Sequence, residues 1–486
     1  MTASGAVLLW FQHDLRLADN PALELALRRR GHVIPLFIWS PEEEGSWPPG
    51  AASRWWLHHS LARLQTSLRK LGSRLIIRSG RVADVLGALV RECGATAVCW
   101  NRRYEPAILA RDRQLQIKLG QLRVQAEISC GSLLFEPEVI TTQSGAPYQV
   151  FSAFWRRCME GGPLAIRPRA APVDMASPQH WPASMQLAEL NLLSAIDWAV
   201  GLRACWEPGE EGANVQLRRF LSVIDNYDGA RDFPGQSGTS KLSPHLHFGE
   251  ISLSQIWSAL DAYDGTELAG AVSRSMTRFR TELGWREFAH HLLFHFPETP
   301  EKPLRAQFAS FPWKKDQTAL RAWQRGETGF PIVDAGMREL WSTGWMHNRV
   351  RMIVASFLAK DLMMNWLEGA RWFWDTLVDA DLANNTMGWQ WTAGCGADAA
   401  PYFRIFNPST QSARFDPQGD YVRHWIPELA KLPTPWIHDP AAAPAGELKL
   451  AGVSLDQTYP KPIVNHAEAR RLALAALETT RAGGDN

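Results

Sequence analysis

A candidate phosphate-binding segment lies at residues 238–244, where hydroxyl and lysine side chains accompany a Ser243-Pro244 pair. Proline is favoured at the start of a helix, and the free N–H groups of a helix N-terminus can bind phosphate together with neighbouring hydroxyls. The same pair also starts many ordinary helices, in which the serine only caps the backbone. The segment alone leaves both interpretations open.

A second group consists of Glu282, Trp285 and Arg286, spaced at i, i+3 and i+4. This spacing places the three side chains on one side of a helix. A carboxylate beside an indole ring could hold a nucleobase. The alternative is a half-buried helix with the tryptophan in the core and the charges in water.

Aromatic, amide and charged side chains gather in two further blocks. Residues 345–352 have the sequence Trp-Met-His-Asn-Arg-Val-Arg-Met, which is expected to start a helix, and residues 379–385 have the sequence Asp-Ala-Asp-Leu-Ala-Asn-Asn. Arg351 and Asp379 are natural ion-pair partners.

Three histidines, His290, His291 and His295, follow the second group, and the last two have the i, i+4 spacing of zinc ligands. No third ligand pattern lies nearby, so we predict no metal site.

The chain has 486 residues, enough for two domains that each bury a sizeable core. It is 45% hydrophobic and 21% charged, and no apolar stretch approaches the roughly 20 residues of a membrane-spanning helix. We therefore expect no membrane association. An apolar run at 6–11 is followed at once by Asp14 and Arg16, so it is predicted to be a first strand and not a signal peptide.

Six scattered cysteines form no C-x-x-C pair, which argues against a zinc ribbon or a disulfide framework and favours a reducing cytoplasm. The net charge of +1 neither predicts nor excludes a nucleic-acid partner, because a local basic face is sufficient for binding. The 23 tryptophans exceed what a core alone requires.

Alternating apolar and helical patterns in residues 1–131 predict a parallel, doubly wound α/β domain. Strands are expected at 7–11, 33–39, 74–78, 96–100 and 125–130, and helices at 20–30, 53–71 and 82–93. No G-x-G-x-x-G follows these strands, so the usual dinucleotide fingerprint is missing.

Residues 132–212 are rich in proline and predict a linker that is helical only near 150–159. From 213 to 486 the apolar periodicity is helical almost throughout, for example at 216–227, 274–293, 333–342, 348–360, 369–378 and 467–482. The fold class is thus α/β, with an N-terminal parallel-sheet domain followed by a larger all-helical domain.

These blocks, together with Trp389-Gln390-Trp391 and the run Pro-Tyr-Phe-Arg-Ile-Phe-Asn-Pro at 401–408, closely resemble the photolyase and cryptochrome family. The resemblance extends from Trp-Phe-Gln-His-Asp-Leu-Arg at 10–16 to Trp-Ile-Pro-Glu-Leu at 425–429, and so covers nearly the whole chain. It implies a light-driven enzyme that splits cyclobutane pyrimidine dimers by electron transfer from reduced FAD. The branch it is most similar to is the bacterial one related to plant cryptochromes, class III.

The resemblance implies a folded-over FAD in the helical domain. Its implied ligands are Tyr227, Thr239, Ser240, Lys241, Leu242, Ser243, Arg286, Trp345, Asn348, Arg351, Asp379, Asp381 and Asn385. A guanidinium near the ring, for which Arg351 is the candidate, favours the anionic reduced flavin that repair needs. Asn385 matches the position facing flavin N5, where photolyases carry an amide and plant cryptochromes an aspartate.

Contacts with a flipped-out dimer also follow from the resemblance, photolyases being among the enzymes known to flip bases. They fall on Glu282, Trp285, Asn348, Arg349, Met352, Trp391 and Arg404. Trp285 and Trp391 would form an aromatic wall, and Glu282, Asn348 and Asn385 are the expected catalytic residues. Asn348 and Met352 stand where the branch that repairs six-four photoproducts has histidines, which removes its expected proton donors. Tryptophan at 285 and 391, where the single-strand-preferring branch has tyrosine, favours duplex DNA.

Trp313, Trp366 and Trp389 match the family's three-tryptophan chain, along which an electron could hop to photoexcited oxidised flavin. In isolation each would be an ordinary core tryptophan.

The N-terminal domain resembles the family's antenna domain, chiefly in Pro-Glu-Glu-Glu-Gly at 41–45 and Ser-Arg-Trp-Trp-Leu at 53–57. This implies a 5,10-methenyltetrahydrofolate antenna with Glu42, Glu43 and Glu44 as candidate contacts, a deazaflavin or no chromophore being the alternatives. The loop 100–107 departs from the Asn-Glu pair that binds folate in many enteric photolyases.

Two rival functions remain. A blue-light receptor would keep the flavin but carry a long signalling tail and an aspartate at 385, and an unrelated α/β nucleotide-binding enzyme would require a phosphate fingerprint in the first domain. We therefore expect a monomeric, cytoplasmic enzyme acting on double-stranded DNA with pyrimidine dimers. Salt-dependent DNA affinity is expected from Arg349, Arg404, Arg414 and Arg423, although a merely solvated surface explains the last two equally well.

Overall fold

A computed structural model describes residues 5–162, 167–263, 269–399 and 404–482. The chain divides into two compact units, each built from segments that are distant in sequence. The first comprises Met1–Asp225, Ser240–Pro297 and Val378–Leu382, and the second comprises Asn226–Thr239, Glu298–Leu377 and Ala383–Asn486. The domain boundaries expected at 131 and 212 stay predictions.

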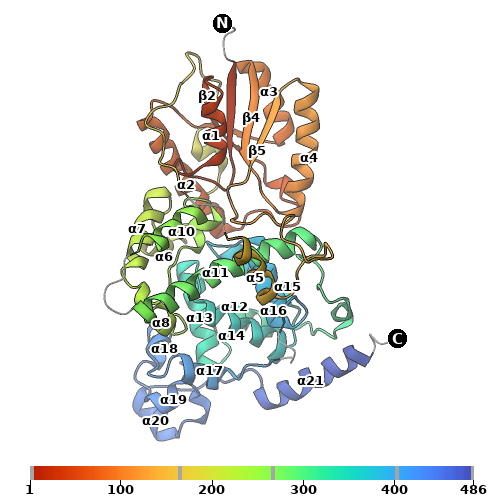
Figure 1. Cartoon of the computed structure of the whole chain (residues 1–486). Helices are drawn as coiled ribbons and strands as arrows, with labels where there is room; N and C mark the ends of the chain where they lie inside the picture. The colour runs from red at the N-terminus through yellow and green to blue at the C-terminus, as the bar shows by residue number, and fades with distance from the viewer. Residues whose placement is uncertain (1–4, 163–166, 264–268, 400–403, 483–486) are drawn as a thin grey trace. The chain divides into compact units, whose positions relative to one another are not determined.

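A five-stranded parallel sheet forms the centre of the N-terminal part of the first unit (Figure 1). The strands are β1 (Ala6–Phe11), β2 (Val33–Trp39), β3 (Ile76–Ser79), β4 (Ala95–Asn101) and β5 (Gln125–Ser129), in the spatial order β3-β2-β1-β4-β5. The predicted doubly wound parallel domain is confirmed. The order reverses between β1 and β4, and the carboxyl ends at such a reversal are where open α/β sheets bind ligands.

Helices cover both faces of this sheet. They are α1 (Pro21–Arg28), α2 (Ala51–Lys70), α3 (Val82–Cys93) and α4 (Pro106–Gln121). Asn20 caps α1 by accepting a hydrogen bond from the N–H of Leu23, and Pro21 follows it at a position where proline suits a helix start. Helix α4 was not predicted, because its buried Ile108, Leu115 and Leu119 are separated by charged residues that mask the apolar period.

The regular elements in the rest of the first unit are helices. They are α5 (Phe151–Gly161), α6 (Val200–Cys205), α7 (Glu210–Leu221), α9 (Ser243–His247), α10 (Leu253–Asp261) and α11 (Ala269–His295), with short 3₁₀ turns at Pro41–Glu43, Leu187–Leu190 and Ile224–Asn226. The single helix expected at 216–227 is wrong. It ends at Leu221, because the Asp225-Asn226 pair favours a turn over a helix interior.

The second unit is built from helices. Its longer ones are α12 (Gln317–Arg325), α13 (Pro331–Thr343), α14 (Asn348–Ser356), α15 (Trp366–Thr376), α16 (Leu382–Ala393) and α21 (His466–Ala482). Shorter ones are α8 (Tyr227–Ala230), α17 (Pro408–Phe415), α18 (Asp420–Trp425), α19 (Thr434–Ile437) and α20 (Ala445–Ala451), with 3₁₀ turns at Ala306–Ser310 (η4), Pro427–Leu429 and Pro440–Ala442.

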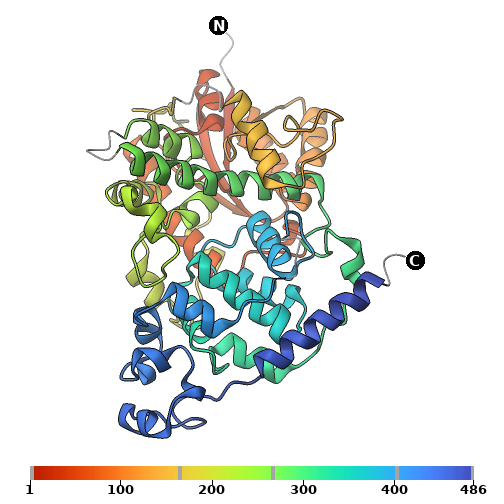
Figure 2. The ribbon, with the colours of Figure 1, turned by 60° about the horizontal axis from the view of Figure 1, so that its bottom comes forward.

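The helix expected at 348–360 continues past α14 as a π-helical turn, η5 (Phe357–Asp361). Helix α21 lies against η5 and against η4 (Figure 2), and the His466 ring contacts the buried carboxylate of Asp361. Among the described residues, no helix combines the length and apolar character needed to span a bilayer.

Candidate functional site

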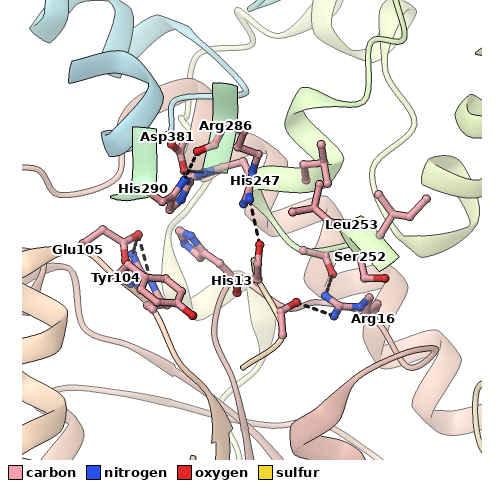
Figure 3. Close-up of a pocket in the computed structure, with 16 residues that line it drawn as sticks. His13, Arg16, Tyr104, Glu105, His247, Ser252, Leu253, Arg286, His290 and Asp381 are labelled. Carbon is pink, nitrogen blue, oxygen red and sulfur yellow. Dashed lines mark hydrogen bonds and ion pairs between the residues drawn. The ribbon is translucent and has the colours of Figure 1, made fainter. Parts of the chain in front are cut away.

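A polar cavity of about 30 Å³ lies at the carboxyl ends of β1 and β4 (Figure 3). Charged and imidazole side chains line it from four directions: His13 and Arg16 after β1, Arg103 and Glu105 after β4, His247 on α9, and Arg286 and His290 on α11 together with Asp381 before α16. All of these residues belong to the first unit.

Asp381 is one of two carboxylates that line this cavity, the other being Glu105. Oδ2 of Asp381 lies 3.5 Å from Nε2 of His290 and 3.7 Å from Nδ1 of His247. Burial by itself would raise the pKa of Asp381, but His290, His247 and Arg286 outweigh burial and hold that pKa well below its usual range. Asp381 therefore carries a negative charge inside the protein.

His13 adds a neutral ring to the cavity wall. Its ring contacts that of His247 edge to face, with the centroids 4.7 Å apart. Burial, then the neighbouring Arg103 and His247, lower the pKa of His13 well below the ordinary value.

Arg103 also lines the cavity, and it pairs with two glutamates. Its guanidinium binds Glu44 in a bidentate pair at 2.7 and 2.9 Å, and Glu105 at 2.8 Å. Glu43, next to Glu44, accepts a hydrogen bond from the N–H of Val82, whereas Glu42 is exposed. Two of the three antenna candidates therefore already hold structural partners.

Helix α11 presents the predicted group Glu282, Trp285 and Arg286. The Trp285 ring stacks on Phe151 of α5, with ring centroids 3.7 Å apart and planes 11° apart, and the Arg286 guanidinium donates to the Ser132 carbonyl. A Cβ at Gly284 would come within 2.6 Å of the Trp155 ring, so glycine permits the close approach of α5 to α11. Trp285 is thus held rigidly by its stacking partner.

Glu287, the next residue on α11, is buried. One oxygen accepts hydrogen bonds from the N–H groups of Leu134 and Phe135, and the other has no hydrogen-bond partner among the described residues. Burial raises the pKa of Glu287 to about 7, against the opposing effect of Arg286.

The candidate phosphate segment runs along the boundary between chain segments of the two units. Lys241 has a positive φ of 50°, Leu242 is buried, and the Ser240 carbonyl accepts a hydrogen bond from the Gln216 side chain at 2.7 Å. Helix α9 begins at Ser243 as predicted, and no side chain of the described residues caps it. In the second unit, a Cβ at Gly238 would lie 2.6 Å from Cβ of Ala230, so Gly238 lies tightly against the end of α8, the helix that begins at Tyr227.

Helix α14 carries Asn348, Arg349, Arg351 and Met352, and His347 caps its start. Nδ1 of His347 accepts a hydrogen bond from the N–H of Arg349 at 3.2 Å, and burial lowers the pKa of His347 to about 4, so the ring is neutral and able to accept.

The two arginines of α14 have different partners. The Arg349 guanidinium pairs with Asp232 at 2.8 Å and lies over the Phe415 ring, and its Nη1 lies 3.8 Å from the Met352 sulfur. The Arg351 Nε donates to the Met346 carbonyl at 2.7 Å, and its guanidinium lies 5.9 Å from the centre of the Trp345 ring. The expected pairing of Arg351 with Asp379 stays a prediction.

Asn385 lies on α16, and its side-chain Nδ2 donates to the Ala370 carbonyl on α15 at 3.0 Å. This bond fixes the amide orientation, because a carbonyl oxygen can only accept. The Asn385 Oδ1 is thereby turned away from Ala370 and is available as an acceptor.

All three predicted electron carriers belong to the second unit. Trp389 on α16 is buried against Gly369 of α15, where a Cβ would lie 2.0 Å from the Trp389 ring. Trp366, also buried, lies one turn before Gly369 on α15. Trp313 is partly exposed, and the neighbouring Lys314 pairs with Met364, two residues before Trp366. Two of the three rings are thus buried and one is partly exposed, and their role as an electron chain stays a prediction.

The remaining candidates differ in how many contacts their side chains already make within the protein. The Trp391 indole donates to the Asp398 carbonyl at 3.1 Å, Arg404 is exposed, and Arg414 lies over the Phe415 ring. Arg423 donates to the carbonyls of Gln418 and Leu432, which favours a structural role over DNA contact. The Pro-Tyr-Phe part of the run at 401–408 lies outside the described residues.

The histidine pair with zinc-like spacing has other partners. Nε2 of His291 accepts a hydrogen bond from the N–H of Tyr148, and burial lowers the pKa of His291 to about 3. His295 contacts the Pro137 carbonyl. Within the described ranges, no group of three or more His, Cys, Asp or Glu residues has the arrangement of a metal site.

Sequence reasoning missed the clustering of His13, His247 and His290 around Asp381. The four residues come from four distant segments, so no local spacing could reveal them. The one available signal was the resemblance of the flanking runs at 10–16 and 379–385.

Comparisons with known proteins bear on the whole chain. The model described as "DNA photolyase" matches residues 7–174, and that described as "FAD binding domain of DNA photolyase" matches residues 279–479. A deoxyribodipyrimidine photo-lyase of Agrobacterium fabrum is 49% identical, over 97% of this chain and 98% of its own. Cryptochrome-2 of Arabidopsis thaliana is 41% identical, over 99% of this chain and 80% of its own. The crystal structure of a bacterial class III photolyase from Agrobacterium tumefaciens matches with a TM-score of 0.95 at 47% identity, covering 99% of both chains.

The raised pKa of Glu287 predicts a pH-dependent stability. The folded pKa of about 7 lies above the ordinary 4.5, so the favourable contribution of protonated Glu287 is fully present below pH 4.5 and is lost as the pH rises through about 7. Glu287→Gln keeps an acceptor for Leu134 and Phe135 without the charge. At pH 8 this variant should be more stable to urea than the parent by up to about 3 kcal/mol, because each tenfold change in proton affinity corresponds to about 1.4 kcal/mol.

The matched control is the exposed Glu298→Gln, which should change the free energy of unfolding little at any pH. Equal stabilisation by Glu287→Gln at pH 4.5 and pH 8 would contradict the burial argument.

Proposed function

The chain belongs to the photolyase and cryptochrome family, and from this premise we propose that it is a class III deoxyribodipyrimidine photo-lyase that splits cyclobutane pyrimidine dimers in duplex DNA. The observation that carries the choice within the family is the Asn385 amide, which is held by Ala370 with its oxygen available as an acceptor. Reduced flavin has an N–H at N5, and an oriented amide oxygen is suited to receive it. This arrangement favours repair over the receptor function.

FAD is the proposed cofactor, and the residues fit it. The tight Gly238 turn, the left-handed Lys241 and the uncapped start of α9 offer backbone N–H groups, hydroxyls and a cation to phosphates. We assign to FAD the set Tyr227, Thr239, Ser240, Lys241, Leu242, Ser243, Arg286, Trp345, Asn348, Arg351, Asp379, Asp381 and Asn385. When bound, reduced and photoexcited, FAD supplies the electron that opens the cyclobutane ring.

The protein's part in repair is to hold the dimer and to favour the charged cofactor. Trp285, fixed against Phe151, is a rigid stacking surface, and Trp391, fixed through Asp398, is a second one. Glu282 and Asn348 offer an acceptor and an amide to the base edges, and Met352 offers an apolar side chain. Arg351 supplies positive charge that favours an anionic flavin.

DNA phosphates are assigned to Arg349 and Arg404. A third candidate is Arg414, which directly precedes Phe415 in the sequence. Arg349 is already oriented by Asp232 and Phe415, so little side-chain entropy is lost on contact. We further propose that the protein acts as a monomer in the cytoplasm.

Photoreduction of the flavin is assigned to Trp313, Trp366 and Trp389. Two of these side chains are buried and one is partly exposed, an order suited to carrying an electron inward from the surface. The antenna is proposed to be 5,10-methenyltetrahydrofolate, with a deazaflavin as the alternative. Glu42 is the candidate contact whose side chain is exposed.

Repair itself is tested by illuminating the reduced, purified protein with duplex DNA that contains one cyclobutane dimer. Restored thymines are expected in the light, and none in the dark. A light-exposed sample in which the dimer persists would reject the function.

Trp285→Ala should weaken binding of dimer-containing DNA by about tenfold to a hundredfold, because base stacking on an aromatic ring contributes about 1–3 kcal/mol. Flavin absorbance should be retained. Trp198→Ala removes a partly exposed tryptophan elsewhere in the same unit and serves as the control. If the Trp285 variant binds the dimer as tightly as the parent, the stacking role is wrong.

Trp389→Phe should slow photoreduction of oxidised flavin at least tenfold, because phenylalanine is much harder to oxidise, while repair by chemically reduced enzyme continues. Trp425 is a partly exposed tryptophan outside the chain of three, so in Trp425→Phe the flavin should be photoreduced at the parental rate. Equal rates in Trp389→Phe and the parent would remove Trp389 from the electron path.

The antenna assignment is tested by acid extraction of the purified protein. A folate-like absorbance and mass are expected in the extract. An extract that contains flavin alone would reject the folate and leave the FAD assignment standing.

A further inference from the structure

Helix α11 (Figure 1) carries on one side a stripe of four residues that begins with two arginines. At about 3.6 residues per turn, Arg274, Arg278, Thr281 and Trp285 lie within about 60° of one another around the helix axis. The two arginines are exposed, and Thr281 and Trp285 are partly exposed. One side of a single helix therefore carries both these arginines and the ring that is proposed to stack on the dimer.

The stripe is open to solvent only in the N-terminal half of the helix. One and two turns beyond Trp285, the same side of α11 carries Phe288 and Leu292, and both are buried. A partner that contacts the stripe must therefore extend from Trp285 towards the N-terminus of α11 and not in the other direction.

The two arginines of the stripe differ from their neighbour Arg280 in their contacts. Arg280 lies on another side of the helix and pairs with Asp261. Among the described residues, neither Arg274 nor Arg278 has an ion pair or a side-chain hydrogen bond, and this includes Arg278 and Glu282, which are one turn apart. The charge of both arginines is thus available to a partner outside the chain.

The chemistry of the stripe fits the phosphates of duplex DNA. Arginine binds phosphate oxygens through a planar fork of N–H donors, and the duplex on either side of a dimer, here called an arm, presents phosphates at regular intervals. Thr281 stands between the arginines and Trp285 without a charge, and its hydroxyl donates to the Thr277 carbonyl at 2.8 Å. The stripe itself therefore contains no carboxylate that would repel a phosphate.

The spacing along α11 also fits a duplex that extends away from the dimer. Each helical residue advances about 1.5 Å, so Arg278 lies about 10 Å and Arg274 about 16 Å from Trp285 along the axis. Base pairs of a duplex are about 3.4 Å apart along its own axis. For a duplex that follows the helix, the two arginines face phosphates about three and five nucleotides from the dimer.

We propose that Arg274 and Arg278 form a DNA-arm surface, which binds phosphates on one side of the dimer while Trp285 stacks on the dimer itself. The inference rests on the proposed function, because it takes Trp285 as the stacking ring. All the residues involved belong to one helix of the first unit. Phosphates carry no information about sequence or damage, so this surface adds affinity for damaged and undamaged duplexes alike.

The charge contribution is tested by equilibrium binding of the holoprotein, in the dark, to a dimer-containing duplex with long arms. In Arg278→Gln the affinity at about 0.1 M salt should fall about fivefold to tenfold, because one phosphate contact no longer releases counterions. The slope of log affinity against log salt concentration should become shallower by about 0.9, and by about twice that in the double variant Arg274→Gln/Arg278→Gln.

Trimming the DNA locates the contact. Two further duplexes are used, one cut back to the dimer on its 5′ side and the other on its 3′ side. The difference in affinity between the parent and Arg278→Gln should disappear with one of these duplexes and persist with the other, because the stripe extends from Trp285 in one direction only. Any other pattern would overturn the proposal.

A matched control is Arg113→Gln on α4, which alters another exposed arginine of the first unit and should bind DNA as the parent does. Arg278→Lys keeps the positive charge and should keep most of the salt slope. Flavin absorbance and the unfolding temperature check the fold of each variant. Parental affinity and salt slope in the double variant would overturn the proposal, as they would if the arginines bound an acidic protein instead.

Repair by the chemically reduced parent is measured separately on the duplex with both arms. Absence of repair together with the expected dependence on one arm would count against the proposed function and support the DNA-arm surface. Normal repair without that dependence would reject the DNA-arm surface alone.

Discussion

A buried polar network at the carboxyl end of the sheet determines where the cavity and its histidines lie. The Asn101 amide, at the end of β4, donates to Oδ2 of Asp14 at 2.6 Å and to Oδ1 of Asn20 at 2.8 Å. Arg16 donates to the carbonyls of Gly249 and Gly131 at 2.9 and 3.1 Å. Because each unmet buried polar group costs about 1–3 kcal/mol, this network disfavours other arrangements of the segments after β1 and β4. His13, between β1 and Asp14, is placed on the cavity wall as a consequence.

A single helix contact has a comparable role in the second unit. Gly369 and Ala370 are consecutive on α15, and Asn385 and Trp389 are four residues apart on one face of α16. Glycine at 369 admits the Trp389 ring, and the next carbonyl receives the Asn385 amide. The contact between α15 and α16 thus sets both the group assigned to flavin N5 and the adjacent electron carrier. An aspartate at 385 would direct an acceptor at the Ala370 carbonyl unless it were protonated, which is a physical reason for an amide here.

The sequence was sufficient for the fold class and the family, because strand and helix periods are local and the matching runs are long. Strands β1, β2 and β5 lie within one or two residues of their expected bounds. Helix α4 was missed because charged residues mask its apolar period. The break after Leu221 was missed because only residue propensity indicates it. The site residues were proposed from resemblance, and their roles stay predictions. The pairing of His290 with Asp381 could not be predicted, because it depends on the three-dimensional approach of α11 to a segment some ninety residues later.

The tryptophan excess has two physical causes that composition cannot separate. Trp56, Trp100 and Trp323 are completely buried, and their indole N–H groups donate to Glu250, Asp112 and the Val354 carbonyl. These rings fill the cores, and their polar partners offset the cost of burying the indole N–H groups. Trp285 instead rests one face on Phe151 and is only partly covered, an arrangement that fills no core. A large ring that is rigid yet incompletely buried gains little for folding, so its retention is better explained by what it can stack against than by the stability it adds.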